Sequence, residues 1–268
     1  MKILTLLTTF IIAAINAFAV GMIGGGFEDS GETHYVAIIS SSGVATPISG
    51  SAFPQGNGAV SSLAMNASGS AIIGGMENGA YSGTPYIALT SPSGISSRIS
   101  GYVPKGSIGR INSVAINDAG SAIAVGVHQK NDADYMALIS PKGIAKAVSG
   151  TLPILPANIH QASINNQGVA LVGGAQKITC RSTTPNLFYL AFISPQGIAT
   201  PIKGAVPKGA GHVDAVAIND HGAGIVGGYH TSELQDTPYI AMISKEGLAT
   251  EIKGDLPKGL GNIYHRRV

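Results

Sequence analysis

The sequence predicts an all-β protein, a β-propeller of about five four-stranded blades that repeat at about 50 residues. Two markers with the same period support it. A tyrosine that opens Y-x-A-x-(I/T)-S recurs at Tyr35, Tyr86, Tyr135, Tyr189 and Tyr239, and an asparagine that closes a short apolar run recurs at Asn66, Asn117, Asn165 and Asn219. Internal repeats of 20 to 50 residues indicate a repeat architecture. The 37 glycines among 268 residues and the charged fraction of 11% also disfavour long amphipathic helices.

Each repeat divides into four short strands at its turn residues. In the third repeat, we expect strands at 111–117, 121–127, 135–140 and 143–150, because these segments are rich in Ile, Val and Ala and are bounded by turn formers. Asn117–Gly120 and Ser140–Gly143, with their copies, predict tight hairpins in which a side-chain oxygen binds the backbone and glycine takes a positive φ. The other two connections in each repeat are longer and more variable.

Such a meander buries both faces only when copies stack, and radial stacking gives a propeller. A linear solenoid and a membrane barrel fit these strand lengths less well. We expect one domain over 20–268, with blade 1 at 20–50 plus 263–268, blade 2 at 59–101, blade 3 at 109–150, blade 4 at 158–204 and blade 5 at 211–254.

The two ends of the chain predict closure of the ring within one blade. Pro257–Tyr264 align with Pro207–Asp214, which lead into a first strand, so residues 263–268 are expected to complete blade 1. Joining the ends in this way removes exposed sheet edges. The alternative is an open fragment of a larger repeat array.

Residues 1–19 are typical of a secretory signal peptide. Lys2 precedes the apolar run Ile3–Ile15, and Ala17 and Ala19 form an A-x-A cleavage pattern. The run is shorter than the ~20 residues that span a bilayer, so no stable transmembrane segment is expected in the mature chain. The predicted location is the periplasm, the outer surface or the medium. The alternative is a buried strand, because Ala14-Ile15-Asn16 copies part of the repeat.

The repeat motifs resemble a known class of bacterial sequences. Ala217–Gly228 carry A-I-N-x-x-G-x-x-(I/V)-G-G in outline, and Tyr189–Gly197 carry Y-x-A-x-I-S-P-x-G. Together they look like bacterial extracellular repeats of the HAF type and like repeat arrays of autotransporter passenger regions. This resemblance implies a passenger-like protein at the cell surface.

The longer connections predict a binding face. In a meander the tight turns share one end, so the variable connections 76–85, 128–134, 175–188 and 229–238 share the other end with the crossings between blades. Variable loops on a rigid scaffold are the usual place for binding. Lys105, Lys208 and Lys258 occupy equivalent crossings and are candidates to attract an anionic glycan or a phosphate. The alternative is that they are solvated turn lysines.

A second set of candidates lies on the first strand of each repeat. Ser61, Asn112, His160, Asp214 and Tyr264 occupy one equivalent position, and all are polar. If this position faces the channel, His160 and Asp214 could act as an acid–base pair, or bind a metal with Asn112. The alternative is a wet channel rim lined by unrelated polar residues.

Other chemistries lack a sequence signal. Carboxylate pairs at fixed register, G-x-S-x-G, the P-loop, H-E-x-x-H and C-x-x-C do not occur, so we predict no catalytic residues, cofactor or metal. Cys180 is the single cysteine and cannot form an internal disulfide. The net charge of +2, with no cluster of basic residues before Arg266, argues against nucleic acid as a partner.

We therefore predict an exported, non-enzymatic binding module whose partner is a glycan, a surface polymer or a protein. One alternative is a secreted hydrolase that works from the mouth of the channel with His160 and Asp214. Another is a structural fragment without a ligand.

Overall fold

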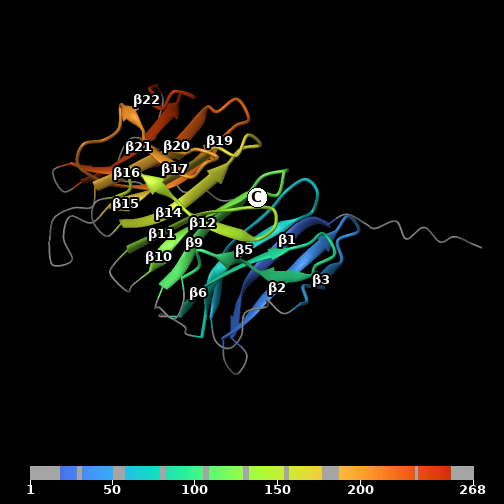
Figure 1. Ribbon diagram of the computed structural model, residues 1–268. Helices are drawn as coiled ribbons and strands as arrows, with labels where there is room; N and C mark the ends of the chain where they lie inside the picture. Colours follow the sequence, from blue (N-terminus) through green and yellow to red (C-terminus); the bar gives the residue numbers. More distant parts are fainter. Residues whose placement is uncertain are drawn as a thin grey trace, which may run out of the picture.

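The computed structural model describes residues 19–28, 32–50, 58–78, 83–104, 109–128, 133–153, 157–176, 187–232 and 235–254. All 22 elements in these ranges are β-strands, and most of them form antiparallel meanders (Figure 1). The all-β prediction is confirmed. Within the described ranges, no helix is long and apolar enough to cross a membrane.

The strands group into five blades that follow the chain. Blade 1 holds β1 (Ala19–Glu28), β2 (Glu32–Ser40) and β3 (Ala45–Pro47); blade 2 holds β4 (Ala59–Met65), β5 (Ala71–Glu77), β6 (Thr84–Thr90) and β7 (Ser96–Arg98); blade 3 holds β9 (Gly109–Ile116), β10 (Ala122–His128), β11 (Ala133–Ile139) and β12 (Ile144–Ala147); blade 4 holds β14 (Ala157–Ile164), β15 (Ala170–Gln176), β16 (Leu187–Ile193) and β17 (Ile198–Pro201); blade 5 holds β19 (Ala210–Ile218), β20 (Gly224–Ser232), β21 (Gln235–Ile243) and β22 (Leu248–Glu251). Figure 1 shows these blades side by side, from blue to red.

Short links tie each blade to the next at its outer edge. β8 (Ser100–Gly101), β13 (Ser149–Gly150) and β18 (Lys203–Gly204) leave one blade and pair in parallel with the outer strands β12, β17 and β22 of the following blade. An isolated parallel bridge between Ser49 and Ile95 does the same for blades 1 and 2. The repeat pattern alone did not predict these links.

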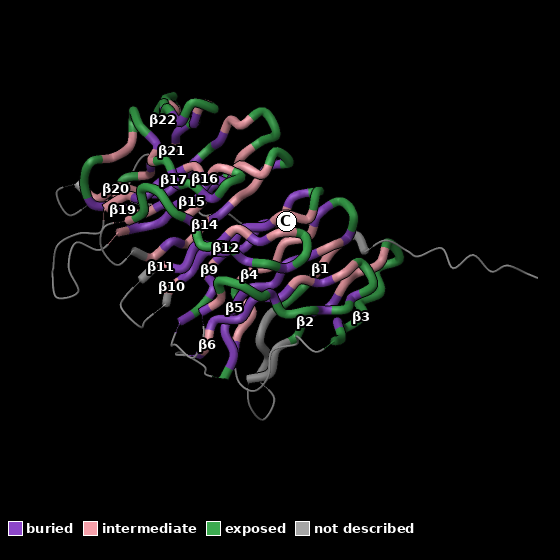
Figure 2. The backbone as a smooth tube through the Cα atoms, viewed as in Figure 1, coloured by how far each residue is buried: buried purple, intermediate pink, exposed green. Residues whose placement is uncertain are grey.

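The hydrophobic core lies between successive blades. Four clusters of buried side chains each join two neighbouring blades: Ile73 and Tyr86 pack with Val36, Ile72 with Ile111, Ile123 with Ile159, and Leu171 with Val213. Figure 2 shows the buried residues running along the middle strands. Burial of these aliphatic faces therefore stabilises the stacking of one blade on the next.

The repeated asparagine has a second role beyond the predicted turn. As expected, Asn117 Oδ1 accepts the backbone N–H of Ser121 at 2.9 Å, and Gly120 has a φ of +80°. In addition, the side-chain amides of the first three asparagines each donate to the backbone carbonyl of the asparagine in the next blade. The three bonds are Asn66 to Asn117 at 2.9 Å, Asn117 to Asn165 at 3.0 Å and Asn165 to Asn219 at 3.1 Å. This relay binds blades 2 to 5 together at the tight-turn end.

The repeated tyrosine anchors the crossing that precedes its own third strand. The hydroxyl of Tyr135 donates to the carbonyl oxygen of Tyr102 at 2.8 Å. Tyr189 and Tyr239 donate in the same way to Thr151 at 3.1 Å and Ala205 at 2.7 Å. Burial raises the pKa of Tyr239 to about 12, so its hydroxyl remains a donor at neutral pH. Both period markers are therefore explained by structure.

The predictions about the two ends of the chain concern residues that the structure does not describe. Residues 1–18, which hold most of the predicted signal peptide, and residues 263–268, which are predicted to complete blade 1, lie outside the described ranges. Both stay predictions.

Candidate functional site

The polar position singled out in the sequence is a β-bulge in each of the four described inner strands. In β4, β9, β14 and β19, the pairing with the second strand skips Ser61, Asn112, His160 and Asp214, respectively. A bulge bends the strand and re-aims the side chain of the extra residue. Each of these inner strands thus carries one unpaired residue at the same position, and the bulge gives its side chain a direction that regular strand pairing would not.

A glycine on the second strand makes room for each bulge. A Cβ at Gly126 would clash with the carbonyl oxygen of Arg110, and a Cβ at Gly174 would clash with that of Asn158. Gly75 and Gly228 stand in the same relation to Ala59 and His212. The repeated glycine of the sequence is therefore required by the close approach of the bulged strand.

The inner strands line a central hollow of about 910 Å³. Its walls come from β1, β4, β9 and β14, and they include the bulge residues Ser61 and Asn112. Ser61 and Asn112 therefore share this hollow, and the expectation that the whole position faces a channel stays a prediction. His160 and Asp214 lie instead in a cluster between blades 4 and 5.

His212 brings His160 and Asp214 together. Its Nδ1 lies 2.7 Å from Oδ1 of Asp214, and its ring centroid lies 4.5 Å from that of His160 on the neighbouring blade. The ring of Tyr229 also stacks with that of His212, with the two ring centroids 6.1 Å apart. The predicted pair is therefore linked through a histidine that the sequence reasoning missed. Its signal was an imidazole two residues before the aspartate in the same strand.

A second network extends this cluster to blade 3. Nε of Arg110 donates to Oδ1 of Asn112 at 2.9 Å, and Nδ2 of Asn112 donates at 2.9 Å to Oδ1 of Asn158 and to the carbonyl oxygen of Ile159. Asn158 lies two residues before His160 on β14. We call the resulting row of side chains the mouth strip; it consists of Arg110, Asn112, Asn158, His160, His212 and Asp214.

The surroundings of His160 in the mouth strip lower its pKa. Burial lowers the pKa of His160 to about 4, with smaller contributions in the same direction from His212 and Arg110, while Asp214 opposes them. His160 is therefore a neutral imidazole at neutral pH. Oδ2 of Asp214 is buried and has no hydrogen-bond partner among the described residues. The strip thus combines amide and imidazole groups and the Arg110 guanidinium with one buried carboxylate oxygen that has no described partner.

A metal is not supported at this position. Within the described ranges, no group of three or more His, Cys, Asp or Glu side chains is placed to hold a metal ion. The metal-binding alternative for His160, Asp214 and Asn112 therefore gains no support.

The remaining candidates are only partly placed. Lys208 is exposed in the crossing before β19, whereas Lys105 and Lys258 lie outside the described residues, as does Cys180. Large parts of the variable connections also lie outside these ranges. The predicted ring of three lysines thus stays a prediction.

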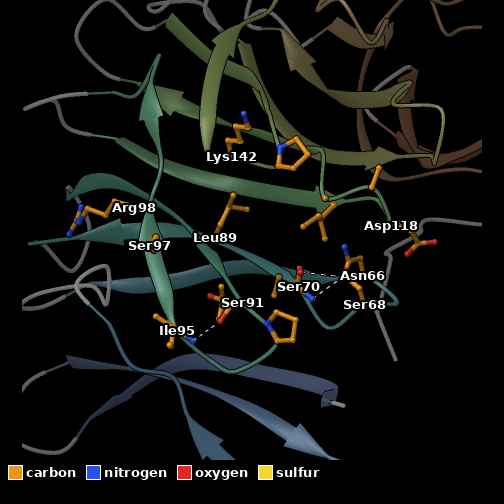
Figure 3. Close-up of a pocket in the computed structure, with 18 residues that line it drawn as sticks. Asn66, Ser68, Ser70, Leu89, Ser91, Ile95, Ser97, Arg98, Asp118 and Lys142 are labelled. Atoms are coloured by element: carbon orange, nitrogen blue, oxygen red, sulfur yellow. Dashed lines mark hydrogen bonds between the residues drawn. The ribbon is translucent and has the colours of Figure 1, made fainter. Parts of the chain in front are cut away.

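Two repeated grooves occupy the tight-turn end, which the sequence did not predict as a binding surface. One lies between blades 2 and 3 and measures about 480 Å³ (Figure 3). Its counterpart between blades 3 and 4 measures about 330 Å³. They have equivalent aliphatic walls, Leu89 and Ile95 in the first and Leu138 and Ile144 in the second.

Comparison with known proteins identifies the architecture. No protein-family model matches the chain, and no curated protein matches it in sequence. Among solved structures, an ulvan lyase of polysaccharide lyase family PL25 is similar with a TM-score of 0.53 and 7% identity over 83% of this chain. A GH74 xyloglucanase from Xanthomonas campestris is similar with a TM-score of 0.56 and 12% identity over 90% of this chain. These neighbours are β-propellers.

The similarity supports the propeller architecture and nothing finer. This chain spans 61% of the lyase and 38% of the xyloglucanase. Because no family model matches, the resemblance to HAF-type repeats and autotransporter passenger regions stays a prediction.

Proposed function

We propose that this propeller is a non-enzymatic binding module that holds a glycan at the mouth strip. The observation that carries the proposal is the repeated bulge, which aims Asn112, His160 and Asp214 from three successive blades into one connected row. Amide, imidazole and carboxylate groups offer the fixed donors and acceptors by which a site orients a hydroxyl-rich ligand. The different polar residues at one repeated place favour recognition over a merely structural role.

Two further points support a glycan as the ligand. The ulvan lyase with a similar fold was also solved bound to the polysaccharide -[GlcA(1-4)Rha3S]-, so propellers of this kind can accommodate a polysaccharide. The predicted signal peptide would place the chain outside the cytoplasm, where surface glycans occur. On this basis we also propose an exported, passenger-like surface protein.

Isothermal titration against a panel of neutral and acidic oligosaccharides tests the proposal. Asn112→Ala should weaken binding about fivefold, because it removes hydrogen bonds worth roughly 1 kcal/mol from a preorganised row. The exposed Lys142 at the tight-turn end supplies the matched control, and Lys142→Ala should bind as the parent does. Equal affinity for the parent and Asn112→Ala would overturn the placement of the site.

One observation favours a second candidate, a hydrolase acting from the channel mouth. Asp214 holds Nδ1 of His212 at 2.7 Å, which is the arrangement that orients an imidazole as a general base. The matching test is turnover of the same oligosaccharides. Product formation that disappears in His212→Gln while binding persists would support the hydrolase over the binding module.

A further inference from the structure

Blade 5 exposes the face that each of blades 2 to 4 buries against its successor. Ile225 on β20 is 42% exposed, whereas its equivalents on the second strands of these blades are completely buried: Ile72, Ile123 and Leu171. Each of the three is covered because the following blade packs on it. Met242 on β21 lies on the same face and is 48% exposed. Blade 5 therefore presents an apolar junction face that no described blade covers.

Blade 1 exposes the opposite face, which blades 2 to 5 bury against the blade before them. Ile23 on β1 is 44% exposed, whereas its equivalents on the other second strands are buried: Ile73, Ala124, Val172 and Val226. Ala45 on β3 is exposed, whereas its equivalents on the other outer strands are buried: Ser96, Ala145, Ala199 and Ala249. Blade 1 thus presents the counterpart of the face on blade 5.

The link that leaves blade 5 shows the same vacancy at the outer edge. In the four earlier links, a Cβ on the glycine would touch the backbone of the next outer strand, as at Gly204 with the carbonyl oxygen of Ala249. Gly254 occupies this position after blade 5 and also has a positive φ, +124°, but no described atom lies within 4 Å of a Cβ there. Ala45 is the residue of blade 1 that corresponds to Ala249. Both partners of one more junction are therefore present among the described residues, and both are exposed.

The two faces belong together but do not meet within one chain. Both are exposed in the same molecule, and Figure 1 shows blades 1 and 5 at opposite ends of the row. Each copies a face that packs on its counterpart at four junctions inside the chain. We propose that the face of blade 5 binds the face of blade 1 of a second copy, as blade 4 binds blade 5. Such a head-to-tail contact is heterologous, because each copy contributes two different surfaces.

The junction of blades 4 and 5 provides the template for the contacts. There, a Cβ at Gly224 would lie 2.8 Å from the side chain of Leu171. Gly21 lies four residues before Gly25, as Gly224 lies four before Gly228, so Ile225 should pack on Gly21 of the second copy. Burial of these aliphatic side chains would stabilise the contact as it stabilises the internal junctions.

The template also predicts a backbone contact at the outer edge. Lys203 and Gly204 pair in parallel with Leu248 and Ala249. Lys253 and Gly254 should therefore pair with residues 44 and 45 of the second copy. These contacts lie away from the mouth strip, so the proposal is independent of the proposed glycan binding.

Size-exclusion chromatography with light scattering tests the association of the full chain. At high protein concentration, the parent should have at least twice the mass of one chain. Ile225→Glu and Ile23→Glu should each remain monomeric, because the contact would bury a carboxylate against an apolar face. The control is Ile144→Lys, since Ile144 is an equally exposed aliphatic side chain but lies in a groove at the tight-turn end. It should associate as the parent does.

Mixing the two glutamate variants tests the head-to-tail arrangement. Ile225→Glu keeps the face on blade 1, and Ile23→Glu keeps the face on blade 5, so an equimolar mixture should form dimers although neither variant does so alone. Recovery of the dimer also shows that both variants are folded. A parent that stays monomeric at every concentration would overturn the proposal, as would a mixture that stays monomeric where the parent associates. Association that persists in Ile225→Glu alone, or that is lost in Ile144→Lys, would place the contact elsewhere and would equally overturn it.

Discussion

The two ends of the inner strands obey different rules. At the tight-turn end the same residue recurs in blades 2 to 5, as in the relay through Asn66, Asn117 and Asn165. At the opposite end the backbone recurs but the residue changes, from serine to asparagine, histidine and aspartate at the bulge. Repetition of a residue thus marks a contact that every blade needs. Variation at a repeated geometry marks the place where function can be carried.

The largest expected effect comes from filling the space opposite a bulge. Gly174→Val would place side-chain atoms against the carbonyl oxygen of Asn158 in a well-packed blade. Overpacking of this kind should lower the free energy of unfolding by about 3 kcal/mol. Urea denaturation of the parent and of Gly174→Val measures this loss in the free energy of unfolding. Gly209→Val is the control, because the nearest neighbour of a Cβ there is 4.0 Å away, and an equal loss in the control would contradict the bulge explanation.

Cutting the asparagine relay should have the next largest effect. Asn117→Ala removes a buried amide that binds Asn165 and leaves its own turn without the oxygen that accepts from Ser121. The expected loss in the free energy of unfolding is about 2 kcal/mol. Asn219→Ala is the comparison. It removes the equivalent turn oxygen in blade 5, which accepts from the backbone N–H of Ala223. It keeps all three described relay bonds, because Asn219 takes part in them only through its backbone carbonyl. It should cost clearly less, and equal losses would show that only the turn matters.

Acid should weaken the contact between blades 4 and 5. The folded chain binds a proton at His160 only near pH 4, whereas an unfolded histidine binds it near 6.5, because burial and then His212 and Arg110 disfavour the imidazolium and Asp214 compensates only in part. Protons therefore favour the unfolded state between these values. Stability should fall by about 2 kcal/mol as the pH drops from 6.5 to 4.

Replacing His160 provides the control for this pH dependence. His160→Asn keeps a polar side chain at the bulge and should flatten the fall in stability, measured as the urea midpoint at a series of pH values. An unchanged slope in His160→Asn would assign the effect to another group.

The features that could be predicted from the sequence are the local ones, and those that could not are contacts between distant residues. The period, the strands and the tight turns were readable because each depends on local patterns, such as Asn117 three residues before Gly120. The relay and the tyrosine anchors were not, because they join residues about 50 and 33 positions apart through side-chain geometry. At the site, the equivalence of Asn112, His160 and Asp214 could be predicted, but the bulge and the bridging His212 depend on how the strands approach one another.

The smallest expected effect concerns the tyrosine anchor and again contrasts two blades. Tyr135→Phe keeps the buried ring but loses the hydrogen bond to the carbonyl oxygen of Tyr102, so the free energy of unfolding should fall by about 1 kcal/mol. Tyr35 holds the equivalent position in blade 1 but is 38% exposed, against 2% for Tyr135. Tyr35→Phe should therefore be nearly neutral. A larger loss for Tyr35→Phe than for Tyr135→Phe would mean that the first blade is anchored as tightly as the others, and that exposure of this ring does not report its contribution.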